Sequence, residues 1–122
     1  MDLYGLVDFN QEKAILFVPR LDNLYKIWMT VMTKEDYQAK YEIEVRYIDE
    51  LQEYLATNCG MATNTTVYLN RGVNSDSKLQ TQVPEQTYLA DLRCDYDQLH
   101  DILSESRTVK NDEEVLALRW SS

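Results

Sequence analysis

Histidine and cysteine are scarce in this sequence, which limits the chemistry open to it. The 122 residues include one histidine, His100, and two cysteines, Cys59 and Cys94. The cysteines form neither a CxxC pair nor a zinc-spaced set. No GxSxG, HExxH, phosphate-loop or GxGxxG pattern occurs. Hydrolysis needs a nucleophile with its base or an open metal site, so we predict no catalytic residue, no metal ligand and no cofactor in this chain.

Positive charge is also scarce. Lys and Arg number 12 against 21 Asp and Glu, which gives a net charge of −9. Nucleic acids and anionic membranes both require clustered Lys and Arg, so we expect neither as a partner. The acidic surface is either simply solvated or attracts a basic protein. Because the sequence has neither a signal peptide nor an apolar run near 18 residues, we expect a cytoplasmic, reducing location with both thiols free.

Strand and helix patterns alternate along a chain that has the length of one domain. Runs of β-branched and aromatic residues predict strands at 3–9 and 14–18, joined as a hairpin by polar residues 10–13. Shorter runs predict strands at 44–47, 66–69, 87–89 and 107–109. The alternation predicts an α/β fold with a mixed β-sheet flanked by helices. Because a strand begins so near residue 1, we expect the sheet to be incomplete at its N-terminal end.

Helices are predicted where a capping residue precedes a helical apolar pattern. Asp22 precedes such a pattern, whose stripe consists of Leu24, Ile27, Trp28, Val31 and Met32. Thr33 and Asp36 resemble a capping box for a second, short helix. A third helix is expected over residues 49–57, ended by Gly60 in a left-handed turn.

Two further helices are expected in the last quarter of the sequence. Asp95 can cap the first of them, whose inner side would be formed by Tyr96, Leu99, Ile102 and Leu103. Asn111 can cap the second, and its acidic first turn suits the helix dipole. Trp120 lies on this last helix and would normally need a neighbour to cover it.

Trp28 is the main candidate for a binding residue. It is either a core tryptophan on the amphipathic helix or an exposed aromatic residue that contacts a ligand or partner. Tyr25 and Met29 lie outside the apolar stripe and would extend such a surface. The periodicity of the sequence does not decide between these two interpretations.

Two other features could carry chemistry. In the loop of residues 71–77, Arg71 could bind a carboxylate, but many such loops are only tight turns. His100 could act as a general base with Asp97 or Asp101, or it could be a partly exposed structural residue.

The order of several short segments carries a family resemblance. They are Phe17-Val18-Pro19-Arg20-Leu21, Trp28-Met29, Lys34-Glu35, Lys40-Tyr41, Tyr47-Ile48-Asp49-Glu50, the loop 71–77, Leu99-His100, Glu105-Ser106-Arg107, and 110–114 with Leu118 and Arg119. Together they resemble the N-terminal domain of eukaryotic-type prolidases, which are Xaa-Pro dipeptidases. The sequence departs from that family in a slightly short segment after Met29 and in Asp101, where the family often has proline.

The resemblance implies a creatinase-like N-terminal domain over residues 1–110, with residues 111–122 beginning a linker helix toward a catalytic domain. Such a domain supports dimerisation and helps to close the active site. In these enzymes the catalytic domain holds two metal ions, commonly manganese, and cleaves Xaa-Pro dipeptides. The resemblance also implies that Trp28 reaches toward the substrate pocket of a partner subunit.

The expected partners are therefore a second subunit of a homodimer and the catalytic domain, with a dipeptide as substrate of the parent enzyme. An alternative is a protein-binding module related to the pseudo-peptidase histone chaperones, which use a similar domain without catalysis. The acidic charge would suit basic partners of such a module.

Overall fold

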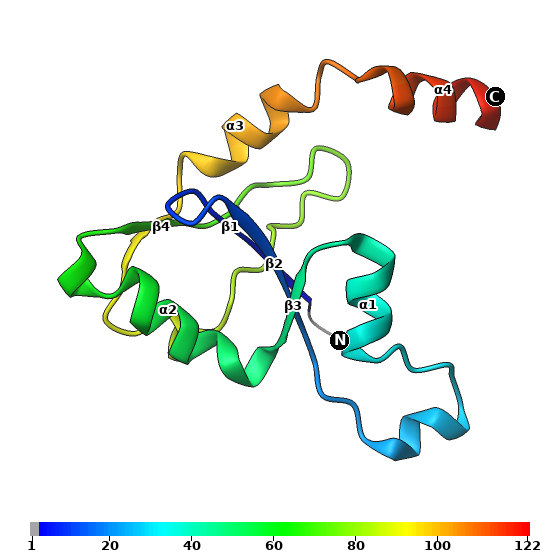
Figure 1. Ribbon diagram of the computed structural model, residues 1–122. Coiled ribbons are helices and arrows are strands. Elements are labelled where there is room, and N and C mark those ends of the chain that lie inside the picture. The colour runs from blue at the N-terminus through cyan, green and yellow to red at the C-terminus, as the bar shows by residue number, and fades with distance from the viewer. Residues whose placement is uncertain (1–2) are drawn as a thin grey trace.

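The computed structural model describes residues 3–122 (Figure 1). Its main sheet contains β1 (Tyr4–Asp8), β2 (Lys13–Val18) and β3 (Glu44–Tyr47). β1 and β2 form the expected antiparallel hairpin, whereas β3 pairs in parallel with the other side of β2. The predicted α/β fold with a mixed sheet is therefore confirmed.

A second, two-stranded sheet pairs β4 (Thr66–Tyr68) in parallel with β5 (Arg93–Asp95). β5 had no sequence signal, because none of its three residues is β-branched or aromatic. The strands predicted at 87–89 and 107–109 are wrong. Gln86–Leu89 is a 3₁₀ helix, η4, and the amide of Thr108 donates to the carbonyl oxygen of Glu105 (3.1 Å) in a turn instead of joining a sheet.

Capping residues set the starts of two of the α-helices, as the sequence indicated. In the described residues the α-helices are α1 (Lys34–Tyr41), α2 (Leu51–Cys59), α3 (Leu99–Ser106) and α4 (Asp112–Ser121). Short 3₁₀ helices are η1 (Asn23–Ile27), η2 (Ile48–Glu50) and η3 (Met61–Thr63). Thr33 forms the predicted capping box of α1 with Asp36, and Asn111 forms one for α4 with Glu114.

The core lies between the main sheet and α2. Seven buried residues form it, namely Ile15, Phe17, Leu51, Tyr54, Leu55, Leu69 and Leu89. Because successive strand residues point to opposite faces, Val18 faces away from this core, as does its neighbour in the sheet, Tyr47. The Nζ atom of Lys34, in α1, lies 5.7 Å from the Tyr47 ring centroid. The two helices therefore flank opposite faces of the sheet (Figure 1).

The amphipathic helix predicted after Asp22 is wrong. Asp22 does cap a helix, but this is the five-residue 3₁₀ helix η1, and none of its residues is buried. Leu24, Ile27 and Trp28 are 65%, 68% and 86% exposed. An amphipathic helix is stabilised mainly by burying its apolar face, and no element of the described chain covers this one.

Gly60 also differs from its prediction. It follows α2 with a φ of −62°, so it is not in the left-handed region. A Cβ atom at this position would lie 2.5 Å from the backbone oxygen of Ala56. The absence of a side chain therefore permits a close backbone approach, and a left-handed turn is not its role.

Helices α3 and α4 form an arm that extends from the body of the molecule (Figure 1). Asp95 supports the start of α3, because its carboxylate accepts the amide hydrogens of Asp97 and Gln98 (both 3.0 Å). The expected inner face of α3 is correct only at its start. Tyr96 packs against the core and Leu99 is partly buried, whereas Ile102 and Leu103 are 60% and 38% exposed. No residue of α3 or α4 is buried.

Candidate functional site

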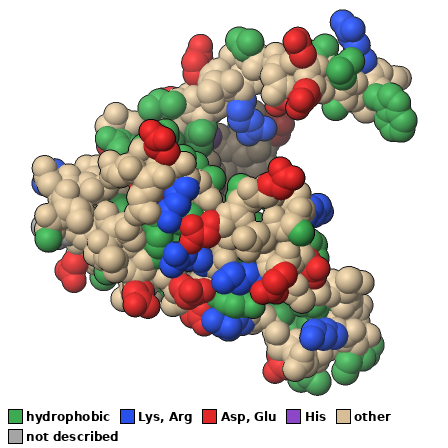
Figure 2. Space-filling model, viewed as in Figure 1, with side chains coloured by type: hydrophobic (Ala, Val, Ile, Leu, Met, Phe, Trp, Pro, Cys, Tyr) green, Lys and Arg blue, Asp and Glu red, His purple; other side chains and the backbone are tan. Residues whose placement is uncertain are grey.

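Residues 22–30 form a projecting, exposed segment that we call the apolar protrusion. Every residue in it is exposed, and its large apolar members are Leu24, Tyr25, Ile27, Trp28 and Met29. The ribbon leaves the sheet after β2 and returns at α1 (Figure 1), and Figure 2 shows hydrophobic side chains gathered over this projecting region. Of the two interpretations of Trp28, the structure excludes the core residue, because 86% of it is exposed.

The backbone of the apolar protrusion is held by local hydrogen bonds. The Asp22 carboxylate accepts the amide hydrogen of Leu24 (3.1 Å). The carbonyl oxygen of Tyr25 accepts those of Trp28 (3.1 Å) and Met29 (3.0 Å). These bonds define a turn that carries the exposed side chains of Tyr25, Trp28 and Met29. Tryptophan and tyrosine supply large contact areas at interfaces, so this geometry suits binding.

The second candidate, the loop containing Arg71, is tied to the start of α3. The Nη2 atom of Arg71 donates to Oδ1 of Asp97 (3.1 Å), and its Cζ lies 4.8 Å from the Tyr96 ring centroid. The side chains of Arg71 and Asp97 are 40% and 87% exposed, so this ion pair is a weak surface contact. Arg71, which the sequence suggested as a carboxylate-binding residue, therefore already contacts the carboxylate of Asp97 in the same chain.

His100 contacts this loop through Asn70 and Gly72. Its Nδ1 lies 3.1 Å from the amide oxygen Oδ1 of Asn70, which accepts the hydrogen bond. A Cβ atom on Gly72 would lie 2.0 Å from the same ring nitrogen. Within residues 3–122 the hydrogen-bond partner of the ring is thus Asn70, and neither Asp97 nor Asp101 forms the acid–base pair that was one of its two interpretations.

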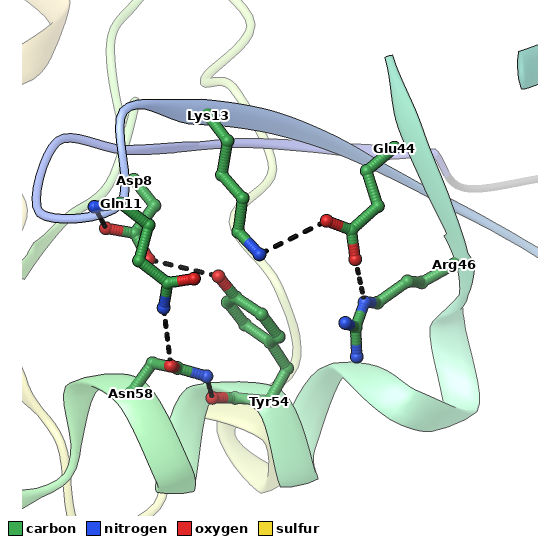
Figure 3. Close-up of polar contacts among 7 residues, drawn as sticks. All are labelled: Asp8, Gln11, Lys13, Glu44, Arg46, Tyr54 and Asn58. Atoms are coloured by element: carbon green, nitrogen blue, oxygen red, sulfur yellow. Dashed lines mark hydrogen bonds and ion pairs between the residues drawn. The ribbon is translucent and has the colours of Figure 1, made fainter.

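A polar cluster that had no sequence signal links the β1–β2 hairpin to α2 (Figure 3). The buried carboxylate of Asp8 accepts the amide hydrogens of Asn10 (2.9 Å) and Gln11 (3.0 Å) and the hydroxyl of Tyr54 (3.0 Å). Burial by itself raises the pKa of Asp8, but these donors and the nearby Lys13 outweigh burial and lower that pKa. Burial and the Asp8 carboxylate together raise the pKa of Tyr54 to about 12.

Charged residues of β2 and β3 extend the cluster across the sheet (Figure 3). Glu44 accepts hydrogen bonds from Arg46 Nε (2.5 Å) and Lys13 Nζ (3.1 Å). The hydrogen bond from Arg46 lowers the pKa of Glu44 against the opposing effect of burial. Lys13 and Arg46 also lie 5.5 and 5.0 Å from the Tyr54 ring centroid. Every group in this cluster has a partner, so the cluster is suited to holding elements together.

The family resemblance implies metal ions in the catalytic domain and none in this part of the chain. Among the described residues no three His, Cys, Asp or Glu side chains converge on a position that could hold a metal ion. We therefore derive no metal-dependent step from this part of the chain. None of the helices in residues 3–122 combines the length and apolarity needed to cross a membrane.

Comparison with known proteins gives a consistent family. The profile described as "Aminopeptidase P, N-terminal domain" matches residues 1–68. The chain is 33% identical over 122 residues to a Xaa-Pro dipeptidase of Mus musculus, and 31% identical over 121 residues to that of Homo sapiens. It is 30% identical over 120 residues to a Phaeosphaeria nodorum protein described as "Probable Xaa-Pro aminopeptidase PEPP". These alignments cover 98%, 98% and 97% of this chain.

The chain belongs to the family of aminopeptidase P N-terminal domains, because the matching residues 1–68 are more than half of it. Within that family it is similar to the N-terminal domain of Xaa-Pro dipeptidases, the prolidases. The resemblance carried by its motifs is therefore confirmed. The chain spans about a quarter (24%) of the length of the curated relatives that it matches.

Proposed function

We propose that this chain serves as the non-catalytic N-terminal domain of a metal-dependent Xaa-Pro dipeptidase. Its tasks are dimerisation and closure of the active site. The similarity to Xaa-Pro dipeptidases over almost the whole chain supports the enzyme class. The chemistry belongs to a catalytic domain of the parent protein, in which a pair of manganese ions would activate water. Cys59 and Cys94 are both free, which fits the reducing cytoplasm.

The observation that carries this proposal is the exposure of Trp28. An 86% exposed tryptophan on a projecting turn is costly to leave in water and well suited to a partner's pocket. Trp28 then packs against the apolar part of a dipeptide in the pocket of the second subunit and limits the length of the substrate. Tyr25 and Met29, 49% and 48% exposed, contact the rim of that pocket.

The test is Trp28→Ala in the full-length dipeptidase. We expect kcat/KM for Gly-Pro to fall by about thirtyfold, as for loss of an interface hot spot of about 2 kcal/mol, or the dimer to dissociate more readily. Steady-state kinetics and sedimentation velocity measure the two effects. Phe9→Ala is the matched control, because Phe9 is 87% exposed on the β1–β2 turn. Unchanged kinetics together with an unchanged dimer would refute the role of Trp28.

The second candidate function is a protein-binding module related to the pseudo-peptidase histone chaperones. The net charge of −9 favours it, because an acidic domain attracts basic proteins. Binding of core histones by the 122-residue chain, weakening as salt rises, would support this alternative. The parent gene decides between the two, since a dipeptidase encodes the metal-binding Asp, His and Glu residues downstream and a pseudo-peptidase does not.

A further inference from the structure

Residues that flank the apolar protrusion on both sides meet on one aromatic ring. Arg20 lies just before the protrusion, and its Cζ is 3.6 Å from the ring centroid of Tyr47. Lys34 follows it as the first residue of α1, and its Nζ is 5.7 Å from the same centroid. Cations within about 6 Å of an aromatic ring are attracted by its negative face. Residues on either side of the protrusion therefore share a single contact point on the sheet.

The ring of Tyr47 is itself fixed by the scaffold. Tyr47 is the last residue of β3 and pairs in register with Val18, the last residue of β2. Its amide hydrogen is accepted by the carboxylate of Glu50 (2.8 Å). The Nε atom of Arg20 donates to Oδ2 of Asp49 (2.6 Å), which keeps the guanidinium over the ring. The contact point is thus part of the sheet and of the turn that follows it.

The protrusion has little else to fix its orientation. Residues 22–30 are all exposed, so burial of their side chains cannot hold them against the body. The hydrogen bonds described for Asp22 and Tyr25 lie within the protrusion and leave its direction free. Contacts of the flanking residues must therefore set where Trp28 points. These are the partly buried Leu21, Val31 and Met32, together with the cations of Arg20 and Lys34 at Tyr47.

We propose that Tyr47 is a positioning residue, whose ring clamps the residues on both sides of the apolar protrusion and so orients Trp28. The clamp follows from the contacts of Arg20 and Lys34 alone. Its consequence for catalysis rests on the proposed function, because an oriented Trp28 reaches a partner's pocket without first paying the entropy of ordering. Phenylalanine retains the aromatic ring that the two cations contact, whereas leucine does not. We therefore expect Tyr47→Phe to keep the orientation of Trp28 and Tyr47→Leu to lose it.

The experiment uses the 122-residue chain carrying Trp120→Phe, so that Trp28 is its only tryptophan. We measure the fluorescence anisotropy of Trp28 and the rate of tryptic cleavage after Lys26, identified by fragment mass. Tyr47→Leu is expected to lower the anisotropy and to raise the cleavage rate about fivefold or more, the factor for loss of about 1 kcal/mol of ordering. Tyr47→Phe is expected to match the parent chain in both measurements.

Two controls separate the clamp from general destabilisation. Tyr68→Leu replaces a 50% exposed tyrosine of the other sheet and should change neither measurement. If Tyr47→Leu does not fold, as judged by urea denaturation, Arg20→Gln with Lys34→Gln removes the two cations and leaves the ring. This double variant is expected to reproduce the faster cleavage. Unchanged anisotropy and cleavage in Tyr47→Leu or in the double variant, or a Tyr47→Phe chain that behaves like Tyr47→Leu, would overturn the proposal.

The same variants in the full-length dipeptidase separate the clamp from the role of Trp28. Tyr47→Leu is expected to lower kcat/KM in the same direction as Trp28→Ala, with rescue by Tyr47→Phe. If Trp28→Ala leaves kinetics and dimerisation unchanged while the anisotropy and cleavage results hold, the clamp stands and the proposed function fails. If Trp28→Ala impairs the enzyme while Tyr47→Leu leaves the anisotropy and cleavage unchanged, the clamp is overturned and the proposed function stands.

Discussion

Asp8 and Tyr54 show how single residues join distant parts of this chain. Asp8 ends β1 and Tyr54 lies in α2, yet the hydroxyl of Tyr54 donates to Oδ2 of Asp8 at 3.0 Å. The other oxygen, Oδ1, accepts two amide hydrogens of the hairpin turn. A buried carboxylate is tolerated only when such donors replace water. This one residue therefore shapes the turn and ties it to the helix.

The alkaline stability of the chain should depend on Tyr54. Its pKa is about 12 in the folded chain against 10.0 for the free group, so the contribution is complete below pH 10 and is lost as pH rises through 12. We expect the free energy of unfolding in urea to decline over this window. Tyr54→Phe should lose about 1.5–3 kcal/mol at neutral pH, because Asp8 Oδ2 lacks its donor. It should also show a smaller alkaline decline; an equal decline in both chains would contradict the assignment.

At the scale of elements, the starts of α1 and α4 and the end of α2 are set by different interactions. Thr33 and Asn111 start α1 and α4 through hydrogen bonds with residues three positions away. Such bonds are encoded within a few residues of sequence. The end of α2 differs, because the position of Gly60 reflects the approach of the carbonyl oxygen of Ala56 and an isolated bridge to Leu92.

Gly60→Ala should destabilise the chain, whereas Gly5→Ala should not. A Cβ atom at residue 60 would meet the backbone oxygen of Ala56 at 2.5 Å, while one at residue 5 has nothing within 4 Å. Backbone atoms cannot move as easily as a flexible side chain. We therefore expect Gly60→Ala to lower the free energy of unfolding by about 1–3 kcal/mol. Urea denaturation of the two variants measures the difference. Equal urea midpoints for the two variants would show that the backbone at the end of α2 shifts at little energetic cost.

At the scale of the whole molecule, stability is concentrated in the body. The buried residues of the core come from β2, α2, η4 and the residue after β4. The arm of α3 and α4 buries none of its side chains, and Leu116, Leu118 and Trp120 are 63%, 55% and 94% exposed. Figure 1 shows this arm extending away from the sheet. The arm and the body are therefore stabilised by different interactions.

The amides of α4 should exchange with solvent far faster than those of β2. An isolated helix shorter than about 12–15 residues is marginal in water, and α4 has 10 residues without a buried side chain. We expect protection of α4 close to that of an unfolded chain, and protection of β2 near the global free energy of unfolding. Hydrogen exchange read by mass spectrometry compares the two peptides. Protection of the α4 amides equal to that of the β2 amides would contradict this expectation, because it would show that the arm is as stable as the core.

Much of the fold was predictable, because its signals are local. The hairpin of β1 and β2, the strand β3, the caps at Asp22, Thr33 and Asn111, and the helix α2 all followed from patterns a few residues long. The family followed from the order of short motifs. The missed strand β5 has no β-branched or aromatic residue, and its pairing with β4, far away in sequence, makes it a strand. The polar cluster of Asp8 and Tyr54 was missed for the same reason, since 46 positions separate its members.

The amino-acid sequence by itself determined the β1–β2 hairpin and the starts of η1, α1 and α4, because capping and hairpin hydrogen bonds form between near neighbours. It could not determine whether an apolar stripe is covered. The periodicity of Leu24, Ile27 and Trp28 predicts a buried helix. In the structure these same residues form a turn that projects into solvent. Only the tertiary structure decided this, because burial depends on which other segments arrive at the same place, and none of the described ones reaches the apolar protrusion.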